Sequence, residues 1–423
     1  MPVKKNFFIL FILAFSTFAG AFMSFIFQTI IARNLSPTEF GFFSATNTLI
    51  LTVSPLCGFG VAQFILKSFA NYGIYAKNFL PIIRSFIFKT TALVILSIIL
   101  YLFLFHNGID LTLSLLMLFM IIPILLTEVT SCLFQLERNY IKLALTQSIV
   151  NWIKPIILLI SIYFFSKNIN TVVISIFISS IIASMLLYPS TIRFFLGRIN
   201  LENYNFTLSP QKNITIKNVI IDSIPFGMSG FLYLIYFQLN ILLLKLISSS
   251  LDAGIYSVAF IIISATTLIP NIIYQKFLLP KLHVWAYHEY EKLKKVYFLG
   301  NILMLTLGMI IAISIYFLAP LIINNIFGEK YYESIIILKY LSFCIPFYYI
   351  SSNAGAILNT RNLISIKIKC MGITAIYSVI SNIVFIYTMG IFGSVLSTLT
   401  SNILLMFLYI VANNKHMLKE PNV

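Results

Sequence analysis

The sequence contains little charge. Only 9% of its 423 residues are Asp, Glu, Lys or Arg, whereas about a quarter is usual for a soluble globular domain. Hydrophobic residues make up 60% of the chain, and the mean hydropathy is +0.98. This composition excludes an ordinary soluble enzyme and predicts an all-α integral membrane protein that crosses the bilayer many times.

Residues that usually carry chemistry are also scarce. The four cysteines are scattered and form no C-x-x-C pair, so neither a disulfide framework nor a metal site is indicated. The histidines at 283 and 288 do not form an H-E-x-x-H motif, and no G-x-x-x-x-G-K-[ST] phosphate-binding pattern occurs. We therefore predict no catalytic residue, no metal and no cofactor.

Long apolar runs are what the chain does contain. A helix needs about 20 apolar residues to cross a bilayer, and twelve runs qualify. Six precede the longest polar break, at 7–32, 40–66, 85–105, 111–135, 143–166 and 170–190. Six follow it, at 219–247, 253–279, 296–319, 334–358, 370–388 and 391–412. The break at 191–218 divides the chain into an N-terminal lobe, 1–190, and a C-terminal lobe with a tail, 219–423.

Basic residues alternate between the two sides of the predicted membrane. With the N-terminus taken as cytoplasmic, 22 of the 28 Lys and Arg residues fall in cytoplasmic segments. Arg33, Lys167 and Lys330 fall in outer loops, and the remaining three lie within spans. Because cytoplasmic loops are enriched in Lys and Arg, we predict that both termini and the 191–218 connection are cytoplasmic. The same distribution explains the net charge of +16 without a nucleic-acid partner.

A short polar corner occurs twice. The segment "ARNLSPTEFGFFSA" follows the first span, and "LISSSLDAGIYSVA" follows the seventh. In both, a serine precedes an acidic residue by three positions, which predicts helix starts with Ser36 and Ser249 as N-caps. The matching positions indicate duplication of a six-helix unit. Because six is even, both repeats enter the membrane in the same direction, which predicts two parallel lobes around a central cleft.

These two corners, the six-plus-six layout and the length together resemble the polysaccharide flippases. That family is the O-antigen (Wzx-type) branch of the multidrug/oligosaccharidyl-lipid/polysaccharide (MOP) exporter superfamily. The resemblance covers essentially the whole chain. It implies movement of an undecaprenyl-diphosphate-linked oligosaccharide from the inner to the outer leaflet of the bacterial plasma membrane. It also implies contact with membrane lipids and with other polysaccharide assembly proteins.

Charges inside spans are the main candidates for substrate contacts, because they are costly in lipid. Lys154 lies midway along the fifth predicted span and Glu128 lies in the fourth, at depths that differ by roughly 6 Å. One interpretation is a structural ion pair between the two helices. The other is that Lys154 contacts the substrate diphosphate within the cleft.

Further candidates lie near span ends or carry no charge. Each has a structural alternative: snorkelling or anchoring for the basic residues, helix-start capping for Asp222, and bonding between helices for the amides. The set comprises Arg33, Lys245, Lys339, Asp222, Gln28, Gln238 and Asn240.

Two other functions fit a membrane protein of this kind. A cation-coupled multidrug antiporter of the same superfamily would need a buried acid, for which Glu128 is the main candidate. A membrane glycan polymerase would need a larger extramembrane surface than the short outer loops provide. The excess of buried lysines over buried acids favours a flippase with an anionic substrate.

Overall fold

The computed structural model describes residues 2–201, 216–360 and 363–417, and within these ranges the chain is helical with no strand. Among the described residues, ten helices are long and apolar enough to cross a membrane, or eleven if the bent pair Ser334–Ser342 and Cys344–Ile357 counts as one span. The all-α polytopic fold is therefore confirmed. Most of the predicted connection 191–218, including 202–215, lies outside the described residues.

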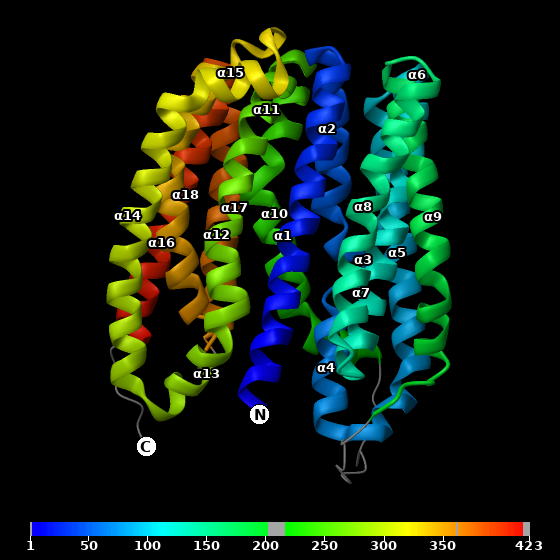
Figure 1. The fold of residues 1–423 in the computed structure, drawn as a ribbon, viewed down its shortest axis with the longest axis vertical. Coiled ribbons are helices and arrows are strands. Elements are labelled where there is room, and N and C mark those ends of the chain that lie inside the picture. Colours follow the sequence, from blue (N-terminus) through cyan, green and yellow to red (C-terminus); the bar gives the residue numbers. More distant parts are fainter. Residues whose placement is uncertain (1, 202–215, 361–362, 418–423) are drawn as a thin grey trace. The chain divides into compact units, whose positions relative to one another are not determined.

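The helices follow the predicted spans closely (Figure 1). Those of the first half are α1 (Pro2–Asn34), α2 (Pro37–Val53), α3 (Pro55–Gly58), α4 (Val61–Tyr72), η1 (Gly73–Phe79), α5 (Leu80–Phe105), α6 (Gly108–Met117), η2 (Leu118–Met120), α7 (Ile121–Leu136), α8 (Tyr140–Phe164) and α9 (Ile169–Phe195). Those of the second half are α10 (Ile216–Ile247), α11 (Ser250–Thr266), α12 (Leu268–Asn271), η3 (Ile272–Leu278), α13 (Leu279–His288), α14 (Tyr290–Ile322), η4 (Ile323–Phe327), η5 (Glu329–Tyr331), α15 (Ser334–Ser342), α16 (Cys344–Ile357), α17 (Ile364–Met389) and α18 (Ile391–Met417).

The structure has fewer candidate spans than the twelve predicted because two predicted spans belong to one continuous apolar stretch. Residues Pro37–Phe105 form one apolar helical stretch of 69 residues, where the sequence predicts two spans, 40–66 and 85–105. At about 1.5 Å per residue, such a stretch as a single straight helix would be roughly 100 Å long. It is instead interrupted between α2 and α5, so it contains both predicted spans.

The interruption is sharpest between α3 and α4. Phe59 and Gly60 both adopt left-handed backbone conformations, with φ of 43° and 75°. Glycine is also required at position 60 by space, because a Cβ there would lie 2.4 Å from the backbone nitrogen of Gly227 in α10. The broken end of this helix therefore packs directly on the backbone of α10.

Contacts divide the chain into two compact units. Unit 1 comprises 1–27 and 49–231, and unit 2 comprises 28–48 and 232–423. Helices α1, α2 and α10 each contribute residues to both units. The units therefore differ from the lobes 1–190 and 219–423, which remain a prediction based on the repeat.

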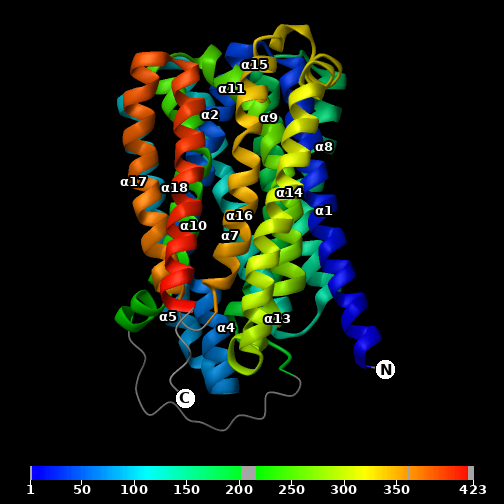
Figure 2. The ribbon, with the colours of Figure 1, turned by 90° about the vertical axis from the view of Figure 1, so that its left-hand side faces the viewer.

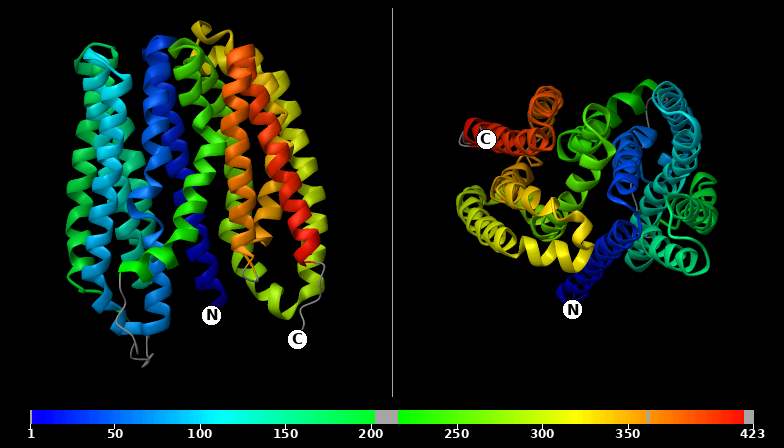
Figure 3. Two further views of the ribbon diagram at one scale, coloured as in Figure 1. Left: turned by 180° about the vertical axis from the view of Figure 1, so that it is seen from behind. Right: turned by 90° about the horizontal axis from the view of Figure 1, so that it is seen from above.

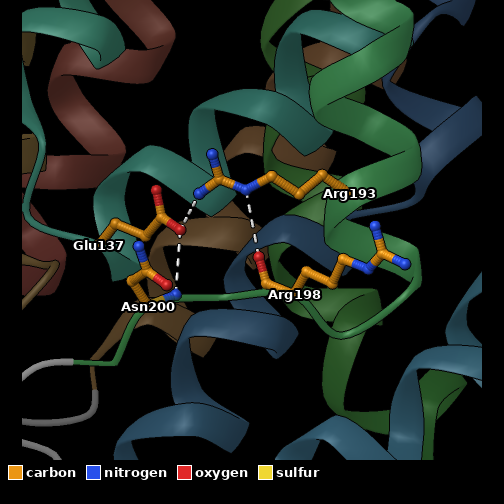
Figure 4. A network of polar contacts seen from close by, with 4 residues as sticks. All are labelled: Glu137, Arg193, Arg198 and Asn200. Carbon is orange, nitrogen blue, oxygen red and sulfur yellow. Dashed lines mark hydrogen bonds and ion pairs between the residues drawn. The ribbon is translucent and has the colours of Figure 1, made fainter.

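Unit 1 has an apolar core and a polar junction at one end. The core gathers buried residues of α4, η1, α5 and α7, among them Phe69, Phe79 and Leu133. At the junction, Arg193 of α9 donates to the Glu137 carboxylate, which also accepts the backbone N–H of Asn200 at 3.0 Å (Figure 4). The guanidinium Nε of Arg193 donates to the carbonyl of Arg198. These contacts hold the C-terminal ends of α7 and α9 against the segment that follows α9.

Both predicted corners are confirmed as helix starts. At the first, the Glu39 N–H donates to Ser36 Oγ at 3.3 Å, and the Ser36 N–H donates back to the Glu39 carboxylate at 2.9 Å. At the second, the Asp252 N–H donates to Ser249 Oγ at 3.1 Å. Two backbone N–H groups at the start of α2 and one at the start of α11 thus have side-chain acceptors within unit 2.

The two corners also pack against each other. A Cβ on Gly41 would lie 1.7 Å from the Ser250 carbonyl oxygen, and one on Gly254 would lie 2.0 Å from the Pro37 carbonyl oxygen. Gly41 and Gly254 occupy matching positions in "EFGFFS" and "DAGIYS". Each corner therefore places its glycine on the helix start of the other. Such reciprocity is what the predicted duplication would produce, since a pseudo-twofold relation makes each contact occur twice.

Candidate functional site

Lys154 lies in α8 and is half-buried in unit 1. Pro155 follows it inside the helix, so the next turn lacks one backbone donor. Among the residues that the structure describes, no carboxylate lies within 4.0 Å of Lys154 to form a salt bridge. Its ammonium group is thus available for an anion.

Small and polar residues line the contact between α8 and α1, on the N-terminal side of Lys154. Ser16 Oγ donates to the Ala144 carbonyl at 2.9 Å and lies 2.8 Å from Ser148 Oγ. A Cβ on Gly20 would lie 3.3 Å from the side-chain nitrogen of Asn151, one turn before Lys154. Helices α1 and α8 therefore approach each other closely within unit 1, while α8 also packs against α7 and α9.

Glu128 lies in α7 of the same unit but does not pair with Lys154. A Cβ on Gly58 would lie 3.0 Å from Glu128 Oε2, so the carboxylate contacts α3 at the broken helix. Apolar residues of α4, α5 and α7 surround it, including Val61, Ile87 and Val129. The ion-pair interpretation therefore has no support from the geometry of the described residues.

Three of the predicted basic residues belong to unit 2. Lys245, in the last turn of α10, places its ammonium 4.1 Å from the centre of the Phe42 ring of α2. Lys339 of α15 lies 5.3 Å from the centre of the Tyr316 ring. Arg33 is exposed at the end of α1. These three side chains lie on different helices, α10, α15 and α1.

Asn240 lies in a closed polar network inside unit 2. Its amide nitrogen donates to Thr398 Oγ1 at 2.6 Å and to the Tyr256 hydroxyl at 3.2 Å, and its oxygen accepts from Asn382 at 2.8 Å. Asn240 is fully buried. This geometry agrees with the structural alternative, bonding between α10, α11, α17 and α18, of which the last two form an antiparallel pair (Figure 3).

The remaining predicted residues are all in helices. Gln28 and Gln238 are half-buried, and each lies in the helix that precedes one of the two corners. Asp222 lies within α10, which has already begun at Ile216, so helix-start capping by Asp222 is wrong. Its side chain lies outside the described residues. The role of all nine candidates in substrate binding remains a prediction.

One long-range structural contact has no obvious signal in the sequence. Lys330 of η5 donates to the carbonyls of Arg33, at 2.8 Å, and Leu35, and the hydroxyl of Tyr331 donates to the Ala32 carbonyl at 3.1 Å. These groups cap the end of α1, whose last carbonyls lack helical partners. Burial lowers the pKa of the Lys330 ammonium and Arg33 lowers it further, while Glu39 acts in the opposite direction.

A cluster of aromatic residues around Phe237, which precedes Gln238 in α10, is also not among the candidates predicted from the sequence. The rings of Tyr233 and Phe237 stack with centroids 5.1 Å apart, and Phe237 contacts Phe260 and Tyr348 at 5.1 and 5.8 Å. The signal was present as an i, i+4 spacing of aromatics on one face of α10. In so apolar a chain, that spacing is hard to tell from ordinary packing.

Comparisons with known proteins agree on the fold. The inward-closed lipid II flippase MurJ superposes with a TM-score of 0.66 at 17% identity, covering 95% of this chain and 87% of that one. An inward-facing multidrug resistance transporter of the MATE family, within the MOP superfamily, gives 0.68 at 12% identity, covering 97% and 98%. At such low identity these similarities concern the fold only.

Comparison of sequences gives a narrower assignment. Residues 3–283 match the family model described as polysaccharide biosynthesis protein. The capsular polysaccharide biosynthesis protein CapF of Staphylococcus aureus is 30% identical over 226 residues, so the match spans about half of each chain, 52% of this one and 54% of CapF. The chain belongs to the polysaccharide biosynthesis protein family and has the helical fold of the MOP exporters.

Proposed function

We propose that this protein moves undecaprenyl-diphosphate-linked oligosaccharide repeat units, of O-antigen or a related surface polysaccharide, from the cytoplasmic to the outer leaflet of the bacterial plasma membrane. The observation that carries the proposal is the family match over residues 3–283. The relative named for capsular polysaccharide biosynthesis and the structural similarity to a lipid II flippase support it.

The chemistry of the candidate residues suits an anionic, sugar-bearing substrate. Lys154 is an ammonium without a carboxylate partner among the described residues, and an ammonium is a good point-charge contact for phosphate. On unit 2, half-buried Gln238 and the Tyr233–Phe237 stack offer amide and aromatic contacts for sugars. The mechanism needs no covalent step, since a flippase only lowers the barrier to moving a polar headgroup through lipid.

A cation-coupled multidrug antiporter is the second candidate, and it has one observation in its favour. The MATE transporter gives the TM-score of 0.68, beside 0.66 for MurJ. Because fold alone does not decide function, the family match outweighs this difference. A membrane glycan polymerase is a third and weaker candidate.

Deletion of the gene tests the proposal directly. We expect the deletion strain to lose its surface polysaccharide and to accumulate the lipid-linked repeat unit in the inner leaflet, because the headgroup cannot cross lipid unaided. Lipid extraction and analysis of the headgroup measure the accumulation. Normal surface polymer in a strain without a redundant flippase would reject the function, and accumulation of cationic dyes instead would favour the antiporter.

We further propose that both termini face the cytoplasm, from the asymmetry of Lys and Arg. Exposed Lys167, before α9, then lies outside and exposed Lys281, in α13, lies inside. In intact cells, an impermeant maleimide should label Lys167→Cys and should label Lys281→Cys only after permeabilisation. The four native cysteines are buried, so background labelling should be low. The reverse pattern would overturn the topology.

A further inference from the structure

A pocket of about 520 Å³ opens on unit 2 where α15 packs against α11, α14 and α18. Figure 2 shows α15 at the upper end of the unit, where α14 ends and α18 begins. The volume falls within the range of ordinary ligand sites, about 300–1,000 Å³. All of the lining residues belong to unit 2, so the pocket is complete within it.

The pocket contains one positive and one negative side chain. Lys339 and Glu333 both line it, yet no salt bridge within 4.0 Å joins them in the described part of the chain. Glu333 occupies the N-cap position of α15 but makes no capping hydrogen bond through its side chain. The Tyr316 ring faces the Lys339 ammonium at 5.3 Å, an attraction that leaves the positive charge in place.

Aromatic residues surround these charges. Tyr316, Tyr332, Tyr340 and Phe392 line the pocket, and Tyr340 and Phe392 meet edge to face with centroids 6.0 Å apart. Tyr332 is 70% exposed. Tyrosines gather at the level of lipid headgroups in membrane proteins, so this end of unit 2 has the aromatic composition that is typical of a membrane–water interface.

Apolar side chains continue from the pocket along the helices. Phe343, whose ring lies 6.0 Å from that of Tyr316, is about half exposed, and Phe317 of α14 is 75% exposed. An acyl chain can lie on such a surface while a headgroup fills the pocket above it. The pocket, which contains one positive and one negative side chain, is therefore continuous with an exposed apolar surface on the helices.

We propose that this pocket binds the zwitterionic headgroup of a membrane phospholipid, with its phosphate at Lys339 and its ammonium at Glu333. A phosphoethanolamine headgroup carries this pair of charges, with its ammonium linked to the phosphate oxygen through two methylene groups. An anionic phosphoglycerol headgroup places its phosphate at Lys339 equally well, but its neutral glycerol leaves Glu333 without a positive partner. Under the proposed topology the lipid comes from the outer leaflet. Lys339 is also among the residues predicted to contact the oligosaccharide, so the test measures retention of phospholipid by the purified protein rather than transport, and the two proposals can fail separately.

Native mass spectrometry of the purified full-length protein, with phosphatidylethanolamine and phosphatidylglycerol in equal amounts, tests the assignment. We expect the wild type to retain more phosphatidylethanolamine. Lys339→Ala should weaken its retention about tenfold, equivalent to ~1.4 kcal/mol. Glu333→Gln should remove the preference over phosphatidylglycerol. Soluble glycerophosphoethanolamine at equal concentration should not displace the lipid.

Lys292→Ala and Glu289→Gln are matched controls. These residues form an exposed pair at the other end of α14, 2.9 Å apart, and their replacement makes the same changes of charge. Equal retention of both lipids by the wild type, or equal effects of Lys339→Ala and Lys292→Ala, would overturn the proposal. Displacement by the soluble headgroup would overturn the assignment to a lipid. Thermal unfolding of each variant verifies that the fold is intact.

Discussion

Replacing Lys154 with glutamine is expected to reduce transport of the lipid-linked repeat unit about tenfold or more, the effect of losing at least ~1.4 kcal/mol of favourable contact. The substitution keeps a polar side chain of similar length but removes the charge. Lys154→Arg keeps the positive charge at the same depth and should retain much of the transport. The measurement is surface polysaccharide per molecule of inserted protein in the deletion strain.

Two further variants separate contact with substrate from structural effects. Lys142→Gln removes an exposed lysine from the start of the same helix and should leave transport unchanged. The double variant Lys154→Gln with Glu128→Gln removes both half-buried charges together. If the two residues stabilised each other, the double variant would recover function, because neither charge would remain unpaired.

The structure favours continued loss in the double variant. No salt bridge within 4.0 Å joins Lys154 to Glu128 in the described residues, and Glu128 lies instead against Gly58 of the broken helix. Recovery to near the wild-type level would therefore reject Lys154 as the anion contact. Loss at normal protein abundance would support it.

The main features of the fold could be predicted from residue types alone. Apolar length locates the spans, since a helix in lipid satisfies its own backbone hydrogen bonds and needs only a nonpolar surface. The caps at Ser36 and Ser249 were predicted correctly because a capping residue and its partner are three positions apart. Such features depend on local sequence, so local reasoning finds them.

Contacts between distant residues could not be predicted in this way. The sequence showed that Asn240 is polar, but its partners Thr398 and Asn382 lie more than a hundred positions away. Lys330 likewise looked like an ordinary loop lysine, whereas it caps α1, almost 300 positions earlier. For Asp222, the error concerned a helix boundary, because α10 begins earlier than the apolar run does.

The glycines at matching positions of the two corners show both a feature that local sequence reveals and a long-range contact that it does not. Their equal positions in the repeats were visible in the sequence, but nothing local shows that the two corners meet. In the structure, Gly41 and Gly254 each remove the side chain that would separate the starts of α2 and α11. The contact depends on the absence of a single carbon atom on each side.

Gly41→Ala is accordingly expected to destabilise unit 2 strongly. The added Cβ would lie 1.7 Å from a backbone oxygen, that of Ser250, so no side-chain rotation relieves the clash and the helices must move apart. We expect a cost of about 3 kcal/mol or more, at or above the upper end for overpacked sites. Thermal unfolding of the purified protein and its abundance in the membrane measure the effect.

Gly372→Ala is the matched control. Gly372 lies inside α17, and the nearest atom to an added Cβ is Leu232 Cδ1 at 3.9 Å, an ordinary contact. Because glycine costs a helix interior roughly 0.5–1 kcal/mol relative to alanine, this variant should be neutral or slightly more stable. Gly254→Ala should resemble Gly41→Ala, and the double variant should cost less than the sum, since the first change already separates the two helices. Wild-type stability of Gly41→Ala, or strictly additive effects of the two alanines, would show that the corners do not pack on each other.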